Sequence, residues 1–262
     1  MVRKRMSKAR LRLDTWLVKQ GIATDAGHAK VLIDQGLILV NGSIALTDNR
    51  MIANSDSVLL STPARFVSRG GEKLEAALVA FGVEMNGKHV LDVGASTGGF
   101  TDCVLQRGAV AVTALDVGKS QLHDRLVRDP RVKVLDSTNA RSMTVALVGD
   151  FDVVVADLSF ISLSQVATAL CNVLRPHGDM ILLVKPQFEA EKSEVDKGAG
   201  VIRDVEIHQR TIAQVVDAFN TQGMMQSGLI ESPLRGADGN TEFLLHLRRD
   251  LLSGAHSVSG VE

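Results

Sequence analysis

Short apolar segments alternate with amphipathic segments from residue 68 onward, and this alternation constrains the fold more than any other feature of the chain. The apolar segments predict strands at residues 90–93, 110–115, 132–135, 151–156, 180–184, 227–230 and 242–247. The amphipathic segments predict helices at residues 72–81, 99–107, 121–128, 163–174 and 205–221. Strands that alternate with helices form a mostly parallel sheet covered on both faces. The sequence therefore predicts an α/β, Rossmann-like domain with a seven-stranded sheet.

The first 62 residues follow a different pattern and predict a separate, small α+β domain. Residues 12–20 and 25–35 are expected to form two helices, the second capped by Thr24. Strands are expected at residues 37–40 and 51–61, with an Asn-Gly hairpin turn at 41–42. The expected domain order is a basic flexible tail at 1–10, the small domain at 11–62, a linker at 63–67, the Rossmann-like domain at 68–250 and a flexible tail at 251–262.

Charge is distributed unevenly between these two parts. Residues 1–62 carry nine Lys and Arg side chains against five Asp, which gives this segment a net charge of +4. Because the whole chain has a net charge of −1, the remaining 200 residues sum to −5. A basic module attached to an acidic one is typical of proteins that bind a polyanion such as nucleic acid. The alternative is a solvated basic tail that binds no partner.

Composition argues against several other classes of protein. No apolar run approaches the ~20 residues that cross a bilayer, and no apolar stretch follows the basic N-terminus as in a secretory signal. Two cysteines, Cys103 and Cys171, are too few for a disulfide framework or a zinc site. We therefore expect a cytoplasmic protein without membrane association or bound metal, either a monomer or a weak dimer.

A glycine-rich turn follows the first strand of the predicted sheet. The segment Asp92-Val93-Gly94-Ala95-Ser96-Thr97-Gly98-Gly99-Phe100-Thr101 leads from this strand into a helix. Such a turn lets a ligand approach the backbone closely. Its spacing departs from the Gly-x-Gly-x-x-Gly of nicotinamide-binding turns, which stays as the weaker alternative. The carboxylate of Asp92 would repel a pyrophosphate, whereas it would attract the ammonium group of S-adenosylmethionine.

Acidic residues also follow the next two strands. Asp116 and Val117 follow the second strand, and Asp136 and Ser137 follow the third. The carboxyl ends of parallel strands meet at one edge of the sheet, where doubly wound folds bind their ligands. We expect Asp116 to accept both ribose hydroxyls of adenosine and Asp136 to accept the adenine amino group. S-adenosylmethionine is therefore the expected cofactor.

Asp157 and Lys185 follow the fourth and fifth strands. Because strands one and four flank the switch point of a doubly wound sheet, Asp157 is also expected to lie close to the cofactor. A lysine at the end of an apolar strand is costly unless it has a partner or a purpose. One interpretation is an ion pair with Asp157 that fixes the surrounding loops. The other is catalysis, because methyl transfer to a hydroxyl needs an aligned nucleophile and a base. Lysine serves as that base when burial or a second cation disfavours its ammonium form.

The N-terminal pattern resembles the S-four-type RNA-binding domain of ribosomal proteins. The matching segments are Arg12-Leu13-Asp14, Ala29-Lys30-Val31-Leu32-Ile33 and Gly36-Leu37-Ile38-Leu39-Val40-Asn41-Gly42. In that family, basic side chains on the two helices contact the RNA backbone. The resemblance implies this role for Arg10, Arg12 and Lys30, and it rests physically on phosphate neutralisation and counterion release.

Four further motifs occur in order along the rest of the chain: Phe66-Val67-Ser68-Arg69-Gly70-Gly71-Glu72-Lys73-Leu74, Asp157-Leu158-Ser159-Phe160-Ile161-Ser162-Leu163, Lys185-Pro186-Gln187-Phe188-Glu189 and Gly239-Asn240-Thr241-Glu242-Phe243. With the N-terminal segment they resemble the TlyA family, whose members bear names both as haemolysins and as ribosomal RNA 2′-O-methyltransferases. The resemblance covers residues 11–248. It implies a class I methyltransferase domain similar to the FtsJ type, acting on ribosomal RNA or ribosomal subunits.

The resemblance also implies a catalytic tetrad of Lys73, Asp157, Lys185 and Glu242. Lys185 would be the base or the orienter of the 2′-hydroxyl, the two acids would hold the lysines, and Lys73 would supply positive charge and contact substrate. Arg65 and Arg69 are expected RNA contacts. The charged loop at 189–204 is either a segment that closes over substrate or a plain surface loop.

Three alternatives stay open at this point. A base-directed RNA methyltransferase is weakly suggested by Asp157-Leu158-Ser159-Phe160, which lacks the two prolines of the exocyclic-amine motif. A lytic protein is suggested by the haemolysin names alone, without a spanning segment in the sequence to support it. A non-catalytic RNA-binding factor would not need the acids and lysines at the strand ends.

Overall fold

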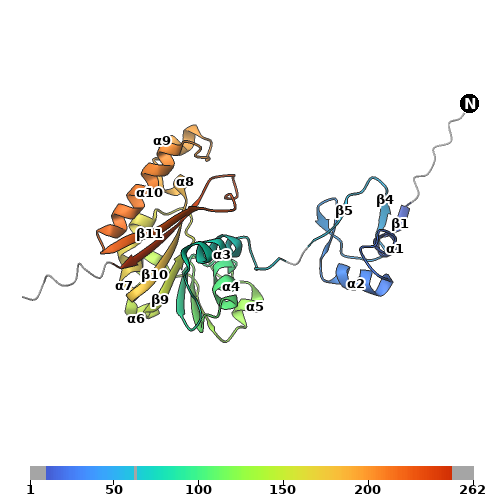
Figure 1. Ribbon diagram of the computed structural model, residues 1–262, viewed down its shortest axis with the longest axis horizontal. Helices are drawn as coiled ribbons and strands as arrows, with labels where there is room; N and C mark the ends of the chain where they lie inside the picture. The colour runs from blue at the N-terminus through green and yellow to red at the C-terminus, as the bar shows by residue number, and fades with distance from the viewer. Residues whose placement is uncertain (1–9, 62–63, 250–262) are drawn as a thin grey trace, which may run out of the picture. The chain divides into compact units, whose positions relative to one another are not determined.

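The computed structural model describes residues 10–61 and 64–249. These residues form two compact units that divide between Ala64 and Arg65 (Figure 1). The sequence assigns Arg65, Phe66 and Val67 to the linker expected at 63–67. Here they belong to the second unit, because Phe66 is buried and the backbone N–H of Val67 donates to Asp102 Oδ2 at 2.8 Å.

The N-terminal unit consists of two short helices and five short strands. Its elements are β1 (Arg10–Arg12), α1 (Leu13–Lys19), α2 (Ala26–Asp34), β2 (Ile38–Val40), β3 (Ser43–Ile44), β4 (Met51–Ala53) and β5 (Val58–Leu60). β1 pairs with β4, and a second sheet has the order β3-β2-β5. The expected helix at 12–20 therefore starts one residue later, because Arg12 pairs with Met51 in β1. Arg10, expected in the flexible tail, pairs with Ala53 in the same sheet.

The second helix of this unit is capped by Asp25, so the prediction of Thr24 as the cap is wrong. The Asp25 carboxylate accepts from the backbone N–H of His28 at 2.8 Å. The hydroxyl of Thr24 instead lies 3.2 Å from Asp25 Oδ2. Asp25 directly precedes the first turn of α2, so its carboxylate places a negative charge at the helix N-terminus. The helix dipole stabilises a negative charge there.

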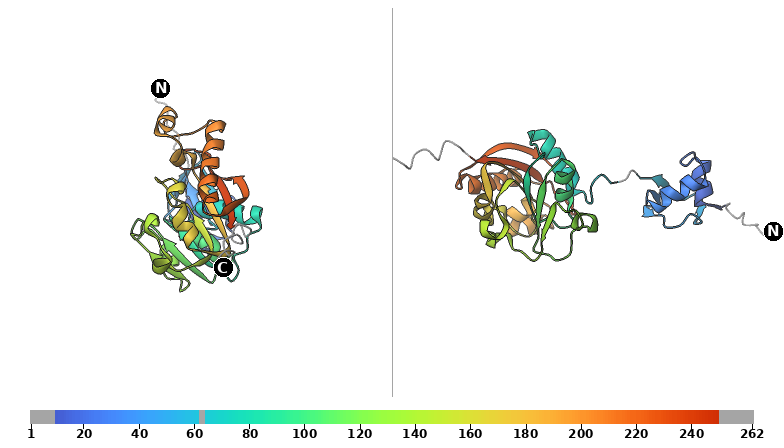
Figure 2. Two further views of the ribbon diagram at one scale, coloured as in Figure 1. Left: turned by 90° about the vertical axis from the view of Figure 1, so that its left-hand side faces the viewer. Right: turned by 90° about the horizontal axis from the view of Figure 1, so that it is seen from below.

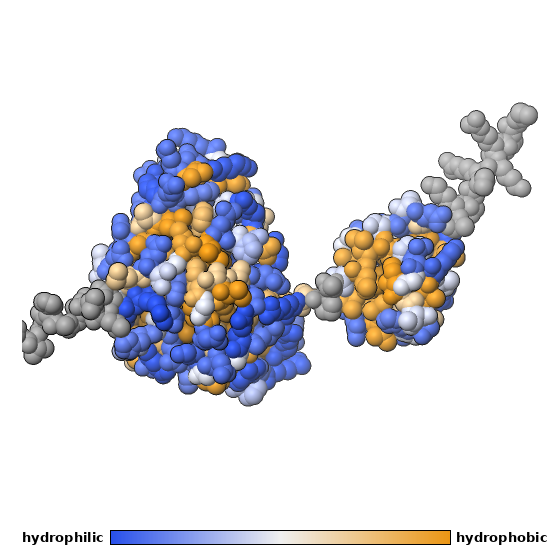
Figure 3. All heavy atoms as spheres, in the orientation of Figure 1, coloured by the Kyte–Doolittle hydropathy of each residue, from blue (hydrophilic) through white to orange (hydrophobic). Residues whose placement is uncertain are grey.

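The small sheet of the N-terminal unit buries one face and exposes the other. Ile38 and Val40 face the core, which they share with Leu13, Leu17 and Ile52. Leu39 points to the other face, between its register partners Ile44 and Leu59, which are 54% and 57% exposed. Apolar side chains consequently reach the surface of this unit (Figure 3).

The second unit is built on one seven-stranded sheet with the order β11-β12-β10-β9-β6-β7-β8. Its strands are β6 (His89–Val93), β7 (Ala111–Leu115), β8 (Val132–Leu135), β9 (Phe151–Ala156), β10 (Leu174–Val184), β11 (Met224–Glu231) and β12 (Phe243–Arg249). Strands β6 to β10 are parallel, and β12 runs antiparallel between β10 and β11. The predicted α/β sheet is confirmed, and its strand order reverses between β6 and β9.

Helices cover both faces of this sheet (Figures 1 and 2). They are α3 (Gly70–Phe81), α4 (Gly99–Gln106), α5 (Asp124–Val127), η1 (Ala140–Ser142), α6 (Val145–Val148), η2 (Leu163–Gln165), α7 (Ala167–Asn172), α8 (Pro186–Glu189), α9 (Lys192–Lys197) and α10 (Val205–Asn220). Successive strand residues alternate between two cores. Leu91 and Val93 of β6 face one core, while Val90 packs with α3 and α4 in the other. Within the described ranges, none of the helices is both long and apolar enough to span a membrane.

Two predicted helices are shorter in the structure. The segment expected as one helix at 163–174 consists of η2 and α7, and Leu174 already pairs with Phe151 of β9. The helix ends early because this segment contains β-branched residues, at positions 166, 168 and 173, which favour strands over helices. A bulge between Leu174 and Asp179 lets the chain begin β10 at Leu174. The helix expected at 121–128 is reduced to α5, which His123 caps through its ring nitrogen.

Candidate active site

The glycine-rich turn between β6 and α4 is held against the next strand of the site. Gly94 has a φ of +82°, and a Cβ there would lie 2.6 Å from the carbonyl oxygen of Asp157. Gly98 has a φ of +95°, and a Cβ there would lie 2.3 Å from Leu126. Only glycine combines these conformations with such close contacts. The turn therefore brings its backbone next to the loop that follows β9.

The same turn fixes the start of α3. A Cβ on Gly99 would lie 2.2 Å from Ser68 Oγ and 2.9 Å from the backbone nitrogen of Gly71. Gly71 in turn leaves room for the Phe66 ring, which a Cβ there would approach to 2.3 Å. Helix α3 carries Lys73, so these glycine contacts set where that lysine enters the site.

A pocket of about 480 Å³ opens at the carboxyl ends of β6, β7 and β9. Its lining includes five expected cofactor residues, namely Gly94, Ser96, Asp116, Val117 and Asp157. The lining also includes residues that the sequence reasoning did not assign, namely Gln121, Thr138, Asn139, Ala140, Arg141 and Leu158–Ile161. Asp136 and Ser137 are not part of it, and the Asp136 carboxylate accepts from the backbone N–H of Ser120 at 2.8 Å. The residues two to five positions after Asp136 line the pocket in its place.

The Asp116 carboxylate organises the floor of this pocket. Its Oδ2 accepts from the backbone N–H of Ser96 at 2.8 Å, and its Oδ1 accepts from that of Gly118 at 2.7 Å. Each carboxylate oxygen has a second lone pair, so Asp116 keeps accepting capacity for a ligand hydroxyl. This geometry fits a residue that both shapes the turn and accepts from a ribose.

Asp92 lies beneath the turn and is completely buried. Its Oδ2 accepts from the hydroxyl of Thr101 at 2.6 Å, while its Oδ1 is buried without a hydrogen-bond partner among the described residues. Burial raises the pKa of this carboxyl to about 7, opposed by the Thr101 hydroxyl and assisted by the nearby charge of Asp157. An unsatisfied buried oxygen beside the turn is a natural acceptor for a cation.

Lys185 and Asp157 meet in a second pocket of about 260 Å³, which shares Gly94, Ser96, Asp157 and Ser159 with the first. Lys185 Nζ lies 2.5 Å from Asp157 Oδ1 and donates to Ser159 Oγ at 2.9 Å. The Lys185 side chain is only 10% exposed. Ser159 is a contact that the sequence reasoning did not assign, although it lies within one of the family motifs.

The other two expected catalytic residues form a second ion pair at the same site. Lys73 Nζ lies 2.5 Å from Glu242 Oε2, and both side chains are buried. Lys73 lines the smaller pocket together with Asp157, Lys185 and Arg69. The structure thus brings three members of the expected tetrad, Lys73, Asp157 and Lys185, to one pocket. The fourth member, Glu242, is not in the lining of this pocket but pairs with Lys73.

Phe188 lies beside the lysine, and a second aromatic side chain, Phe160, packs against it. Phe160 is 91% exposed and has a φ of +64°, which is unusual for a bulky side chain. Its ring centroid lies 5.2 Å from that of Phe188, and Lys185 Nζ lies 5.8 Å from the Phe188 centroid.

Among the described residues, no group of three or more His, Cys, Asp or Glu side chains is placed to hold a metal ion.

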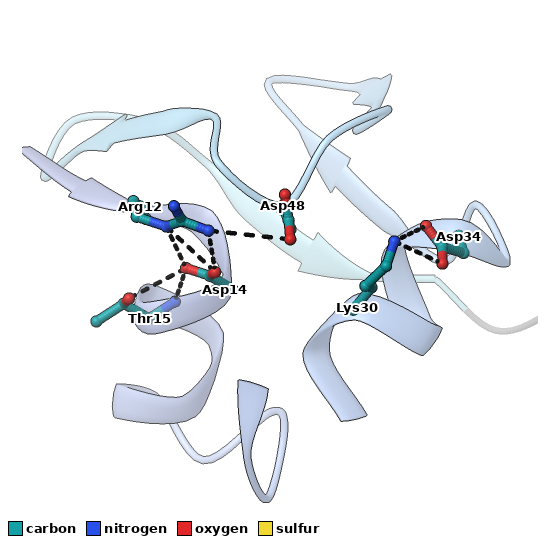
Figure 4. A network of polar contacts seen from close by, with 6 residues as sticks. All are labelled: Arg12, Asp14, Thr15, Lys30, Asp34 and Asp48. Carbon is teal, nitrogen blue, oxygen red and sulfur yellow. Dashed lines mark hydrogen bonds and ion pairs between the residues drawn. The ribbon is translucent and has the colours of Figure 1, made fainter. Parts of the chain in front are cut away.

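The expected RNA contacts of the N-terminal unit are exposed and mostly paired with acids (Figure 4). Arg12 Nη2 lies 2.6 Å from Asp14 Oδ2, and this contact lowers the pKa of Asp14 to about 2. Lys30 Nζ lies 3.0 Å from Asp34 Oδ2, one helical turn away. Arg10 is exposed in β1. The Lys30–Asp34 pair is exposed on both sides and therefore weak, so a phosphate group can replace Asp34. Asp14, by contrast, is buried, and only the arginine of its pair is exposed.

The two arginines near the start of the second unit differ in surroundings. Arg65 Nη1 lies 2.8 Å from Glu75 Oε1, and Glu75 also pairs with Arg107. The hydrogen bonds from Arg107 and Arg65 hold the pKa of Glu75 below its usual range. Arg69 lines the smaller pocket beside Lys73. Of these two arginines, Arg69 is therefore the one that borders the pocket with the two lysines.

Comparisons with known proteins agree with this architecture. The model of the FtsJ-like methyltransferase family matches residues 66–249, and that of the S4 domain matches residues 11–53. The 16S/23S rRNA (cytidine-2′-O)-methyltransferase TlyA of Mycobacterium tuberculosis is 41% identical over 256 residues, which are 97% of this chain and 95% of that protein. Hemolysin A of Brachyspira hyodysenteriae is 37% identical over 238 residues, 90% of this chain and 99% of that protein.

A solved structure from Streptococcus thermophilus, described as a hemolysin, is also similar. It is 36% identical, covers 93% of this chain and 90% of its own, and superposes with a TM-score of 0.70. The family matches account for both units, and the relatives extend over nearly the whole chain. This chain is therefore an FtsJ-like methyltransferase of the TlyA family, with an S4 domain ahead of its catalytic domain.

Proposed function

We propose that this protein transfers a methyl group from S-adenosylmethionine to a ribose 2′-hydroxyl of ribosomal RNA in the cytoplasm. The observation that carries the proposal is the pair of buried lysine–carboxylate contacts beside the nucleoside-sized pocket. A ribose hydroxyl is a poor nucleophile that needs a base and local positive charge. The named activity of the Mycobacterium tuberculosis relative supports the same reaction.

The residues of the larger pocket fit S-adenosylmethionine. Asp116 lies in its lining and suits the ribose hydroxyls. Asp92 is buried beneath the glycine-rich turn, outside the lining of both pockets, and its oxygen without a partner would bind the ammonium of the methionyl end through an opening of that turn. Ser96, Val117 and residues 138–141 would enclose the remaining parts of the nucleoside. The donor supplies a methyl group made electrophilic by a sulfonium centre. No pyrophosphate needs to be placed near Asp92, so the site favours this cofactor over a dinucleotide.

The lysines and acids have separate tasks in this proposal. Lys185 holds the 2′-hydroxyl and accepts its proton, and Asp157 fixes the direction of the lysine. Lys73 adds positive charge that stabilises the developing alkoxide, while Glu242 keeps that lysine in place. The low exposure of both lysines strengthens these interactions, since they act away from bulk water.

We infer that the RNA is held by both units. Arg10, Arg12 and Lys30 would neutralise backbone phosphates on the S4 domain, and Arg69 would contact the nucleotide at the lysines. Arg65 would contribute only if its pair with Glu75 is exchanged for phosphate. A 2′-hydroxyl can enter the pocket only from a splayed or single-stranded nucleotide.

The direct test is the chemical identity of the methylated product. Ribosomal RNA from cells with and without this gene is digested to nucleosides and analysed by mass spectrometry. We expect an additional 2′-O-methylnucleoside that depends on the protein. A base-methylated nucleoside instead would favour the base-directed alternative, and leakage of liposomes by the pure protein without any methylation would favour the lytic one.

Cofactor affinity is expected to fall in acid because Asp92 must be ionised to bind an ammonium. The pKa of this carboxyl is raised to about 7, so the free protein increasingly holds it protonated below that pH. Affinity for S-adenosylmethionine should then decline roughly tenfold for each pH unit below 7. Calorimetry between about pH 5.5 and about pH 7.5 measures this decline, because the ligand's own amine loses its proton only at about pH 8.

The control for this prediction is Asp92→Asn. Its affinity should be weak and independent of pH over the same range. Because folding raises this pKa, ionisation of Asp92 costs more free energy in the folded protein than in the unfolded one. This loss of stability is absent below the unfolded pKa of 3.8 and grows until about pH 7. The variant should therefore unfold at a higher temperature than wild type at neutral pH. A wild-type affinity that stays constant with pH would contradict the assignment of Asp92.

RNA binding is expected to depend on Lys30 through salt-sensitive phosphate contact. Lys30→Ala should weaken RNA binding about three- to tenfold and reduce the slope of log affinity against log salt by about one. Filter binding at several salt concentrations measures both quantities. Lys133→Ala, an exposed lysine of β8, is the matched control and should change neither. Equal effects of the two variants would refute a specific role for Lys30.

A further inference from the structure

We propose that Ser159 is a positioning residue that aims Lys185 at the substrate hydroxyl. This inference rests on the proposed 2′-O-methyl transfer and assigns a role to a side chain outside the expected tetrad. The lysine nitrogen has a fixed number of hydrogen-bonding directions. In the ammonium form Nζ has three donors, and in the amine form it has two donors and one lone pair.

The loop after β9 supplies one ion-pair partner and one hydrogen-bond acceptor to this nitrogen. Asp157 Oδ1 lies 2.5 Å from Lys185 Nζ, and Ser159 Oγ accepts from the same nitrogen at 2.9 Å. Within residues 10–61 and 64–249, Lys185 Nζ has no third hydrogen bond or ion pair. All three side chains line the smaller pocket, so the remaining direction is the one available to a substrate.

Two acceptors are needed to fix the lone pair of a neutral lysine. With Asp157 alone, the amine would rotate about its Cε–Nζ bond and distribute the lone pair over several directions. The Asp157 contact is an ion pair without hydrogen-bond geometry, so the hydrogen bond to Ser159 is the contact that sets the rotation of the amine. With one N–H donated to Ser159 and Asp157 beside the nitrogen, the lone pair is left on the remaining side. Because a hydroxyl is uncharged, it orients the amine without adding a second carboxylate. When the proton of the 2′-hydroxyl moves to Nζ, the hydrogen bond to Ser159 and the ion pair with Asp157 are both retained.

The loop that carries Ser159 is held at both ends. The backbone N–H of Asp157 donates to the Val93 carbonyl at 3.0 Å. At the other end Glu189 accepts from Ser162 Oγ at 2.6 Å and from the backbone N–H of Leu163 at 2.8 Å. Glu189 lies on α8, which begins directly after Lys185. The segment that carries the lysine thus also holds the loop that orients it.

The position of Ser159 makes the hypothesis accessible to mutation. Ser159 is exposed, so its replacement by alanine removes a hydroxyl without leaving a cavity. Ser164, an exposed serine of η2 in the same loop region, provides a matched control. Ser159→Thr keeps the hydroxyl and should largely preserve the contact.

The test measures single-turnover methylation of ribosomal RNA, together with the KM for RNA and the affinity for S-adenosylhomocysteine. We expect Ser159→Ala to slow methyl transfer roughly ten- to hundredfold, with both binding constants within about twofold of wild type. Ser159→Thr should stay within about threefold, and Ser164→Ala should match wild type. Because orientation is lost, raising the pH should not restore the rate of Ser159→Ala.

Several outcomes would overturn the inference. They are full activity of Ser159→Ala, an equal loss in Ser159→Thr, or recovery of the wild-type rate of Ser159→Ala at high pH. These results leave the proposed function intact, provided that the wild-type protein forms a 2′-O-methylnucleoside. If the wild-type protein forms none, the proposed function itself fails, and the role of Ser159 fails with it.

Discussion

Replacing Lys185 with alanine is expected to abolish detectable methylation while leaving cofactor affinity within about threefold of the wild-type value. The lysine side chain lies at the end of a buried strand, in contact with Asp157 and Ser159, and lines the smaller pocket. It is absent from the lining of the larger pocket, where the nucleoside of the cofactor is expected. General bases commonly contribute about 10²–10⁴-fold to the rate, so a loss of at least about a hundredfold is expected.

Two companion variants separate the roles of base and of charge. Lys185→Arg retains a cation but cannot accept a proton at neutral pH, so it should be as inactive as Lys185→Ala. Asp157→Asn should also lose most of the activity, since the amine loses its charged acceptor. Exposed Lys133→Ala serves as the control and should be fully active. Single-turnover methylation and calorimetry with S-adenosylhomocysteine provide the readouts. Substantial turnover by Lys185→Arg would show that Lys185 acts through its charge alone.

Replacing Glu242 with alanine is expected to destabilise the catalytic domain as well as inactivate it. Glu242 is 3% exposed and is the ion-pair partner of Lys73, whose side chain is 11% exposed. Removing the acid leaves a buried ammonium without its partner, which typically costs about 3–5 kcal/mol. For a domain of this size, a loss of that magnitude lowers the melting temperature by roughly ten degrees. Thermal unfolding followed by circular dichroism measures the shift.

A double variant distinguishes the structural task of this pair from its catalytic task. Lys73→Met combined with Glu242→Leu replaces the ion pair by apolar side chains of similar volume, which is often neutral or stabilising. We expect the double variant to melt near the wild-type temperature, to bind cofactor and to remain inactive. Activity in this stable variant would show that Lys73 and Glu242 only support the fold. A wild-type melting temperature for Glu242→Ala would contradict the buried-charge argument.

The candidate site could be predicted from the sequence to the extent that it depends on strand ends. Asp116, Asp157 and Lys185 each follow an apolar run, and parallel strands present such residues at one edge of the sheet. Asp136 follows the same rule, yet its carboxylate binds Ser120, and the chain after it lines the pocket. The position after a strand fixes where a side chain starts, whereas the turn beyond it decides where the side chain points.

Local signals at element boundaries were the least informative. Thr24 and Asp25 are both good helix caps, and only the backbone conformation at Asp25 decides between them. The segment 163–174 has an apolar pattern compatible with one helix, but the pairing of Leu174 with Phe151 ends that helix early. Such choices depend on contacts between residues distant in sequence, which override local preference.

By itself, the sequence determined the two-part organisation, the parallel sheet and the residue types at its carboxyl edge. These follow from hydrophobic periodicity and from charge, which are properties of the chain in order. The Lys185–Asp157 pair was one interpretation of the sequence. Only the tertiary structure decided that Glu242 holds Lys73, that the Asp92 oxygen is buried without a partner, and that Ser159 contacts Lys185. Pairings and burial of this kind arise when separate strands and loops pack together, and no spacing along the chain encodes their distances.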